Sequence, residues 1–275
     1  MGEEESRDTL GDRMKAYEAK VTEEYLDMGT PMYARIDGRA FHTLCRGLKK
    51  PFDSDFVDVM HETCRHLVKE TGANLGYVQS DEISLGWTNP SRAPFEGRMF
   101  KLTSVLASMA GASFMKNALS FGSGEIWSRA QYYVPTFDCR VFNLPSVEEL
   151  VNAFIWRQND CIKNAVSSIA NSLFSVNELN RKNQAEQKEM IRAKGHPFES
   201  YPEHLRIGAF FKRVNVLKAV DPEIAPKIKE EFRHVNENGE WCVMRSEVQM
   251  VQLGRITELE DRAKILFDYV QEEEK

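Results

Sequence analysis

The order of six short segments over residues 32–142 is the feature of this sequence that most constrains its fold. Residues 32–37 alternate apolar and polar side chains, which is typical of a half-buried strand. A helical pattern begins at Ser54, and a second covers residues 98–119. Further strands are expected at residues 75–79, 83–87 and 133–142. This strand, helix, strand, strand, helix, strand order is the split βαβ, or ferredoxin-like, pattern. It predicts an α+β domain whose first strand pairs with the third in an antiparallel sheet, with both helices on one face.

The regions on either side of these segments are expected to be mainly helical. Apolar residues at helical spacing from Leu10 to Tyr25 predict an amphipathic helix that ends near Gly29. Ser146 and Glu149 form a capping-box pattern that opens a long helix. The other expected elements are a helix over 184–194, a strand over 206–214, a hairpin turn at 238–239 leading into a strand over 241–244, and a helix over 256–270. The chain therefore divides into residues 1–143, which hold the six segments, and a mainly helical region with a small hairpin at 144–275.

Composition narrows the class of protein. Of the 275 residues, 42% are hydrophobic and 28% are charged, as in ordinary soluble proteins. No apolar run approaches membrane-spanning length and the first residues are acidic, unlike a signal peptide, so a cytoplasmic protein without a membrane partner is expected. The five cysteines include no CxxC pair, which predicts neither zinc nor disulfides. The formal net charge of −6 argues against general non-specific binding to nucleic acid but allows a local basic cleft.

Two aspartates stand at strand ends. Asp37 closes the first strand and precedes Gly38, where the backbone can turn and a ligand can approach closely. Taken alone, this pair is more often an ordinary turn. Asp81, however, falls in the polar break of the expected hairpin and can meet Asp37 if the two strands are neighbours. Two converging carboxylates suit paired divalent cations in phosphoryl transfer, which favours a metal site.

Two basic residues open the helix over 98–119. Arg98 and Lys101 are three apart and share a face of the first turn, where the helix N-terminus favours anions. They are candidates for phosphate contact, and a solvated first turn is an equal alternative.

Several short motifs occur in order along most of the chain. They are Asp37-Gly38-Arg39 with Phe41-His42, Lys50-Pro51, Ser80-Asp81-Glu82, the Arg98 and Lys101 helix, Phe137-Asp138-Cys139-Arg140-Val141, and Trp156-Arg157-Gln158 with Asp160. Together they resemble the histidine-tRNA guanylyltransferases and, more closely, the guanylyltransferase-like proteins of bacteria and archaea. The likeness is weakest beyond about Arg213.

The resemblance implies a polymerase-type palm in residues 1–143 that adds nucleotides to the 5′ end of tRNA, in the reverse of the usual direction. ATP would adenylylate a 5′-monophosphate, and the 3′-hydroxyl of GTP or another NTP would then displace AMP. Two Mg²⁺ ions would be held by Asp37, the Gly38 carbonyl and Asp81. A homotetramer, built as a dimer of dimers, is also implied. Nucleotide contacts are implied at Arg39, Ala40, Phe41, His42, Lys50, Ser80, Glu82, Arg98 and Lys101, and tRNA contacts are expected at Arg157, Lys163, Asn164, Lys188, Lys212 and Arg213.

One departure from the family pattern bears on the substrate. Histidine-specific eukaryotic members carry a His-Ile-Asn-Asn run, and the corresponding positions here read Ile162-Lys163-Asn164-Ala165. The missing histidine favours template-directed repair of tRNA 5′ ends. The alternatives are dedicated addition of G to histidine tRNA, a palm-fold nucleotide cyclase, and a non-catalytic tRNA-binding module. The hairpin lacks the Gly-Gly-Asp/Glu signature of a cyclase, and the two aspartates argue against a non-catalytic module.

Overall fold

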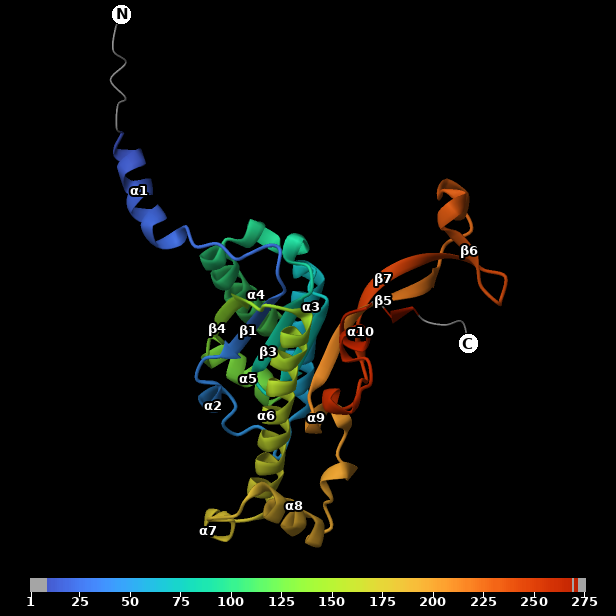
Figure 1. Ribbon diagram of the computed structural model, residues 1–275. Helices are drawn as coiled ribbons and strands as arrows, with labels where there is room; N and C mark the ends of the chain where they lie inside the picture. Colours follow the sequence, from blue (N-terminus) through green and yellow to red (C-terminus); the bar gives the residue numbers. More distant parts are fainter. Residues whose placement is uncertain (1–8, 269, 272–275) are drawn as a thin grey trace, which may run out of the picture.

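The computed structural model describes residues 9–268 and 270–271, and its centre is one twisted sheet (Figure 1). The strands run in the order β4-β1-β3-β2-β5-β7-β6, with every neighbouring pair antiparallel, and β8 pairs in parallel with β5. The strands are β1 (Met32–Gly38), β2 (Leu75–Gln79), β3 (Glu82–Trp87), β4 (Phe137–Asn143), β5 (Ala209–Ala219), β6 (Arg233–Val235), β7 (Trp241–Val251) and β8 (Val270–Gln271). The expected pairing of the first strand with the third is confirmed, because Ile36 of β1 lies opposite Ile83 of β3.

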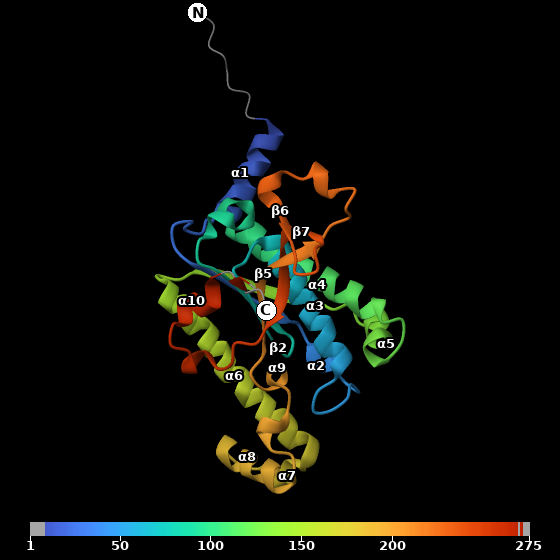
Figure 2. The same cartoon turned by 90° about the vertical axis from the view of Figure 1, so that its right-hand side faces the viewer.

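Helices cover both faces of this sheet. In Figure 2 the sheet is seen nearly edge-on, with α3 (Ser54–Thr71) and α4 (Met99–Ser120) on one side and α6 (Val147–Leu173) on the other. The remaining helices are α1 (Leu10–Thr22), α2 (Phe41–Leu44), α5 (Glu125–Tyr132), α7 (Val176–Leu179), α8 (Gln184–Ala193), α9 (Glu203–Arg206) and α10 (Arg262–Phe267). The protein is thus an α+β fold built on a largely antiparallel sheet.

The alternation along β1 sends side chains into two separate cores. Met32, Ala34 and Ile36 pack in the cluster beneath α3 and α4, whereas Tyr33 packs with Phe154 of α6 on the opposite face. All residues of β2 and β3 are buried because helices cover both faces there. The central hairpin is consequently the most enclosed part of the sheet.

The ends of the main helices follow their capping residues. Asp53 caps α3 by accepting from the Phe56 amide at 3.0 Å, and Gly72 ends that helix in the left-handed conformation. Ser146 caps α6 as predicted, by accepting from the Glu149 amide at 3.3 Å. Only this half of the expected capping box forms, since the Glu149 carboxylate accepts from Asn152 instead.

Two expectations about the flanking regions are wrong, and one is met only in part. The predicted hairpin turn at 238–239 is present between β6 and β7, where Val235 pairs with Trp241. The strands are longer than expected, because β5 and β7 each have 11 residues and β5 joins the main sheet through β2. The expected last helix is interrupted: a turn of 3₁₀-helix at Ile256–Glu258 gives way to extended backbone at Leu259, and Asp261 then caps the short α10. The N-terminal helix ends at Thr22 rather than near Gly29, and none of its residues is buried.

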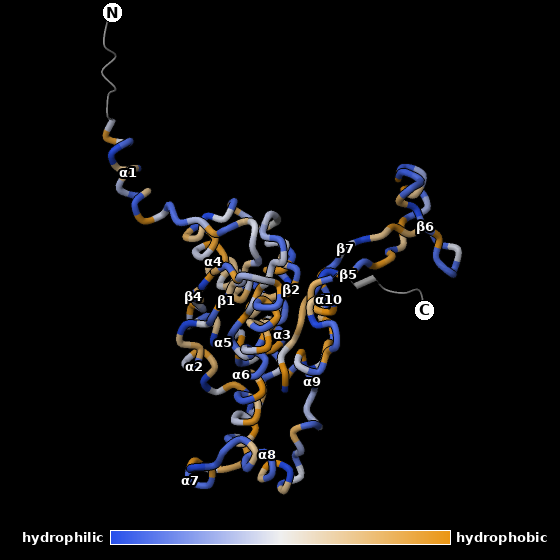
Figure 3. The backbone as a smooth tube through the Cα atoms, in the orientation of Figure 1, coloured by the Kyte–Doolittle hydropathy of each residue, from blue (hydrophilic) through white to orange (hydrophobic). Residues whose placement is uncertain are grey.

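The buried apolar residues form clusters between the helices and the sheet. In Figure 3 the most hydrophobic stretches of backbone lie mainly within the body of the protein. In contrast, α1 extends away from the body, and its apolar residues Leu10 and Tyr17 lie exposed. A search of the described residues finds no helix with the length and apolarity needed to cross a membrane.

Close packing of α3 on β2 yields a test of the fold. A Cβ at Gly76 would lie 2.4 Å from Val68 Cγ2 and 2.7 Å from Cys64 Sγ. Gly76→Ala is expected to lower the free energy of unfolding by about 1–3 kcal/mol, the usual cost of overpacking a core. Gly11→Ala is the matched control, because its Cβ would meet only Thr9 Oγ1, at 3.7 Å. Equal stability of the two variants in urea titrations would contradict this packing.

Candidate active site

The end of β1 and the β2–β3 hairpin bring the two predicted aspartates together. The Gly38 amide donates to the Asp81 carbonyl at 3.0 Å, and Asp37 lies opposite Glu82 in the β1–β3 register. Burial raises the pKa of the Asp81 carboxyl, and the nearby Asp37 charge raises it further. A bound cation would offset the unfavourable charge of Asp81 beside Asp37.

The backbone around this pair is strained on both loops. Ser80 and Ala40 have positive φ angles of 48° and 57°, although neither is glycine. Gly38 is required for a different reason, because a Cβ there would lie 2.5 Å from the Phe41 ring. The loops are therefore held in a specific conformation at the point where Asp37 and Asp81 meet.

The ligand set fits Mg²⁺ better than a metal held entirely by the protein. Among the described residues, no group of three or more His, Cys, Asp or Glu side chains could hold a metal ion. Two carboxylates and a backbone carbonyl leave most octahedral positions to water or phosphate oxygens, which is how Mg²⁺ is commonly bound.

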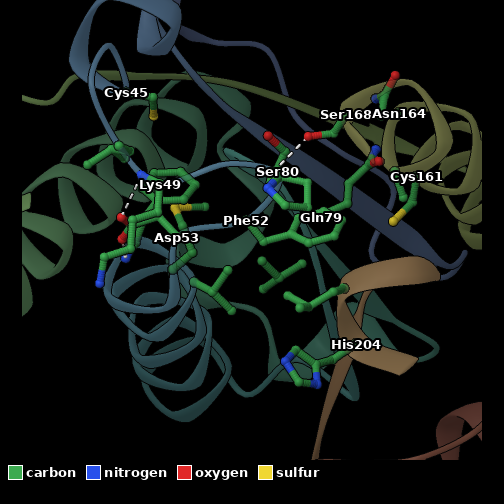
Figure 4. A pocket seen from close by; sticks show the side chains of 18 of the residues that line it. Cys45, Lys49, Phe52, Asp53, Gln79, Ser80, Cys161, Asn164, Ser168 and His204 are labelled. Carbon is green, nitrogen blue, oxygen red and sulfur yellow. Dashed lines mark hydrogen bonds between the residues drawn. The ribbon is translucent and has the colours of Figure 1, made fainter. Parts of the chain in front are cut away.

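A pocket of about 190 Å³ opens beside the hairpin (Figure 4). Lys50 and Ser80, both predicted to contact nucleotide, line it together. Asn164, predicted as a tRNA contact, lines the same pocket from α6. The apolar wall includes Phe52 and Met60. The pocket thus combines a cation and polar groups with apolar surface, as nucleotide-binding pockets require.

Two residues that the sequence analysis missed position the loops of this site. Asp53 accepts from the Lys49 amide at 3.0 Å and so fixes the segment before Lys50 (Figure 4). Arg129 of α5 donates to the carbonyls of Thr43 and Leu44, the latter at 2.9 Å. The sequence could have revealed Asp53, because an aspartate directly before a helical run is a common N-cap. It could not have revealed Arg129, because that contact joins residues 85 positions apart.

Several residues predicted to bind nucleotide through their side chains have other environments. Phe41 is buried against Phe114 and Phe137, so its ring is unable to stack on a base. Arg39 and His42 are exposed on the adjacent loop and remain candidates, as does the backbone at Ala40.

Glu82 is a buried ion-pair partner rather than a nucleotide ligand. The residue is 7% exposed, and its Oε1 accepts from Arg157 Nε at 2.6 Å and from Gln79 Nε2 at 3.1 Å. Arg157 also donates to Asp160 at 2.9 Å. The predictions that Glu82 contacts nucleotide and that Arg157 contacts tRNA are therefore wrong for these side chains, because each is buried and neutralises the other.

Arg98 and Lys101 do not join Lys50 and Ser80 within one chain. The adjoining Met99 amide donates to the Glu24 carbonyl, and Asn143, opposite Met32 in the sheet, contacts the nearby Asp27. This places the start of α4 near the beginning of β1, and Asp37 lies roughly 16 Å further along that strand. Both side chains are exposed, and nucleotide contact by Arg98 and Lys101 stays a prediction for a position separate from the pocket.

The predicted tRNA contacts are scattered. Lys212 is only 2% exposed and its Nζ donates to the Ile265 carbonyl at 2.6 Å, so a direct RNA contact is wrong for this residue. Arg213 is half-buried and donates to the Lys69 carbonyl at 2.7 Å. Lys163 is exposed, and Lys188 is half-buried with its Nζ 4.5 Å from the centre of the Phe198 ring.

Two carboxylates that meet beside a pocket lined by Lys50 and Ser80 suit metal-assisted phosphoryl transfer, the chemistry of nucleotidyltransferases among other enzymes. The model of the tRNAHis guanylyltransferase family matches residues 11–145. The chain belongs to this family of nucleotidyltransferases.

Solved structures and sequence relatives agree with this assignment. A bacterial tRNA(His) guanylyltransferase-like protein solved in complex with ATP matches with a TM-score of 0.73 and 29% identity, covering 94% of this chain and 99% of that chain. The same kind of protein in complex with GTP matches with a TM-score of 0.67 and 28% identity, covering 94% and 100%. The tRNA(His) guanylyltransferase of Debaryomyces hansenii is 29% identical over 143 residues, which is 50% of this chain and 52% of that protein. The chain thus spans about half the length of this curated relative.

The buried ion pair predicts a stability defect. Glu82→Gln is expected to lower the free energy of unfolding by roughly 3–5 kcal/mol, because it leaves the Arg157 charge buried without its partner. Asp160→Asn is the control and should cost less than about 1 kcal/mol, since the Asp160 side chain is 40% exposed. The double variant Glu82→Gln with Arg157→Met should recover stability in denaturant titrations. A stable Glu82→Gln protein that binds ATP weakly would restore the nucleotide-contact role.

Proposed function

We propose that this protein adds nucleotides to the 5′ end of tRNA in the 3′-to-5′ direction, and that its main role is template-directed repair of shortened 5′ ends. The observation that carries the proposal is the meeting of Asp37 and Asp81 beside the pocket lined by Lys50 and Ser80. Relatives of similar fold were solved with ATP and with GTP, the two nucleotides that the proposed pathway uses.

Each residue of the site would have a distinct role in the reaction. Asp37, Asp81 and the Gly38 carbonyl would hold two Mg²⁺ ions on a ferredoxin-like, polymerase-type palm. When bound, such ions neutralise charge at the transferring phosphorus and lower the pKa of the attacking hydroxyl. Lys50, Ser80 and Asn164 would hold the triphosphate in the pocket. Arg39, just after β1, and His42, in α2, are exposed and would contact the activating nucleotide.

Two transfers complete one addition. In the first, a 5′-monophosphate oxygen of the RNA attacks the α-phosphorus of ATP, and pyrophosphate leaves. In the second, the 3′-hydroxyl of the incoming NTP attacks the RNA 5′-phosphorus; the new phosphodiester forms, AMP leaves, and the hydroxyl proton is released. An RNA that already carries a 5′-triphosphate needs only the second transfer, with pyrophosphate as the leaving group. A cytoplasmic homotetramer remains part of the proposal.

A dedicated addition of G to histidine tRNA is the second candidate. It is favoured by the name of the family model, whereas Ile162 in place of the family histidine disfavours it. A base choice made by the protein would need buried donors and acceptors matched to guanine. Templating by the opposite strand of the acceptor stem would require only that the protein hold the backbone.

Removal of either carboxylate tests the metal assignment. Asp37→Ala and Asp81→Ala are each expected to reduce nucleotide transfer roughly a hundred-fold or more, because Mg²⁺ loses a ligand at the reacting phosphorus. Both variants should retain the thermal transition of the unmodified protein, since each aspartate lies at a strand end and only partly buried. Chelation of Mg²⁺ should have the same effect on transfer. Either variant with near-normal activity in Mg²⁺ would overturn the assignment.

The choice of added nucleotide tests repair against dedicated G addition. The substrate is a 5′-shortened tRNA, incubated with ATP, Mg²⁺ and all four NTPs and then sequenced at its 5′ end. C opposite the vacant position should direct G, and A should direct U, on tRNAs of several identities, with addition stopping when the stem is complete. Incorporation of G opposite A, confined to histidine tRNA, would refute the repair role.

A further inference from the structure

A large aromatic side chain lies exposed on the α6 side of the sheet, close to the aspartate pair. Trp156 is 51% exposed, although it lies near the middle of the long helix α6. Two guanidinium groups approach its ring: the Cζ of Arg157 lies 4.5 Å from the ring centroid and that of Arg35 lies 5.3 Å from it. Exposed tryptophan held by arginine is a stacking surface for planar ligands.

The arginines hold this ring from the side of the sheet. Both contact the same carboxylate, since Arg157 Nε lies 2.6 Å from Glu82 Oε1 and Arg35 Nε lies 3.9 Å from Glu82 Oε2. Glu82 belongs to the enclosed strand β3, so the guanidinium groups lie between the sheet and the ring. The exposed surface of Trp156 therefore faces away from the core on a rigid support.

Each guanidinium group on this surface has a carboxylate partner. Arg157 is paired with both Glu82 and Asp160, but the buried Nε of Arg35 has no hydrogen-bond acceptor among the described residues. Arg140 of β4 lies opposite Arg35 in the register and contributes a further guanidinium, paired with Asp138 at 3.1 Å. The three guanidinium groups are matched by the carboxylates of Glu82, Asp160 and Asp138, so the surface is close to neutral and would attract RNA mainly through stacking on the exposed ring.

Position connects this surface to the reacting atoms. Arg35 and Asp37 are two residues apart on β1 and share a face, so their Cα atoms are separated by roughly 7 Å. A nucleotide bound at Asp37 and Asp81 therefore has Trp156 within reach of its neighbour in the RNA chain. Phe142 of β4 lies opposite Tyr33 of β1 and is exposed, so it continues the same face beyond Arg140. A surface longer than one base fits an RNA strand better than a mononucleotide.

We infer that Trp156, supported by Arg35 and Arg157, is a stacking platform for a nucleobase at the 5′ end of the RNA substrate. The inference rests on the proposed function, to which it adds a residue that positions the RNA end. The pocket lined by Lys50 and Ser80 lies toward β2 and α9, whereas the platform lies toward β4, on the other side of the aspartate pair. The nucleotide and the RNA end would thus approach the aspartates from different directions.

Binding of a 5′-shortened tRNA, measured by fluorescence anisotropy in Mg²⁺ at fixed salt, tests the platform. Trp156→Leu should weaken binding roughly five- to hundred-fold, the range for loss of one base stack, and Trp156→Phe should restore most of it. Trp241→Leu is the matched control: Trp241 is 39% exposed with the Arg233 Cζ 5.5 Å from its ring centroid, but it lies on the distant β6–β7 arm (Figure 1). That control should leave tRNA affinity unchanged.

A second RNA separates stacking from a general loss of structure. With an abasic 5′-terminal nucleotide, the unmodified protein should lose about the same factor in affinity, and Trp156→Leu should cost nothing further, as coupled groups behave in a double-mutant cycle. If Trp156→Leu lost the same factor in affinity for both RNAs, or lost no affinity for either, the platform would be overturned. A loss of MgATP affinity with intact tRNA affinity would also overturn it, because the ring would then serve the mononucleotide.

The same assay distinguishes this inference from the proposed function. If the unmodified protein adds nucleotides to shortened tRNA but Trp156→Leu binds that tRNA normally, only the platform fails. If the unmodified protein adds no nucleotide to any shortened tRNA, the proposed function itself fails, whatever the affinity of the variant.

Discussion

The carboxylate of Glu82 is the interaction on which the site depends. It lies in the central strand β3, directly after Asp81, and is enclosed with Arg157 in a layer between the sheet and α6. A buried charge is tolerated only when it is paired and hydrogen-bonded, so α6 must keep Arg157 over this strand. The pair thereby fixes the helix relative to the hairpin that presents Asp81. Through Arg157 it also fixes Trp156 and, one and two turns later, Asp160 and Asn164.

The sequence predicted the local parts of this arrangement well. Alternation and helical spacing located β1, β2, β3, α3 and α4 to within a few residues, because each is patterned by the face that it buries. The proximity of Asp37 and Asp81 followed from the order of these elements, since that order makes the first and third strands neighbours. A strand end followed by glycine and the turn of a hairpin can both be recognised from one amino-acid sequence.

Contacts between distant positions could not be predicted in the same way. Glu82 and Arg157 are 75 positions apart, and nothing in either segment marks its partner. The adjacent basic residues Lys212 and Arg213 suggested an RNA contact, but the Lys212 side chain is buried and its ammonium donates to a backbone carbonyl. The lengths of β5 and β7 were underestimated for a related reason: their outer halves are partly exposed, and register pairing rather than a continuous apolar pattern extends them.

The placement of Arg98 and Lys101 shows that residues from different motifs of one family need not lie in the same binding site of one chain. These residues open α4 beside the segment that precedes β1, and the exposed helix α1 emerges from the same end of the sheet (Figure 1). The carboxylates and the pocket lie at the opposite end, where the β2–β3 hairpin turns. Anions bound at the two ends of one chain would therefore be separate ligands. An RNA that reached both ends along the β1–β4 side of the sheet would pass Arg35, Arg140 and Trp156.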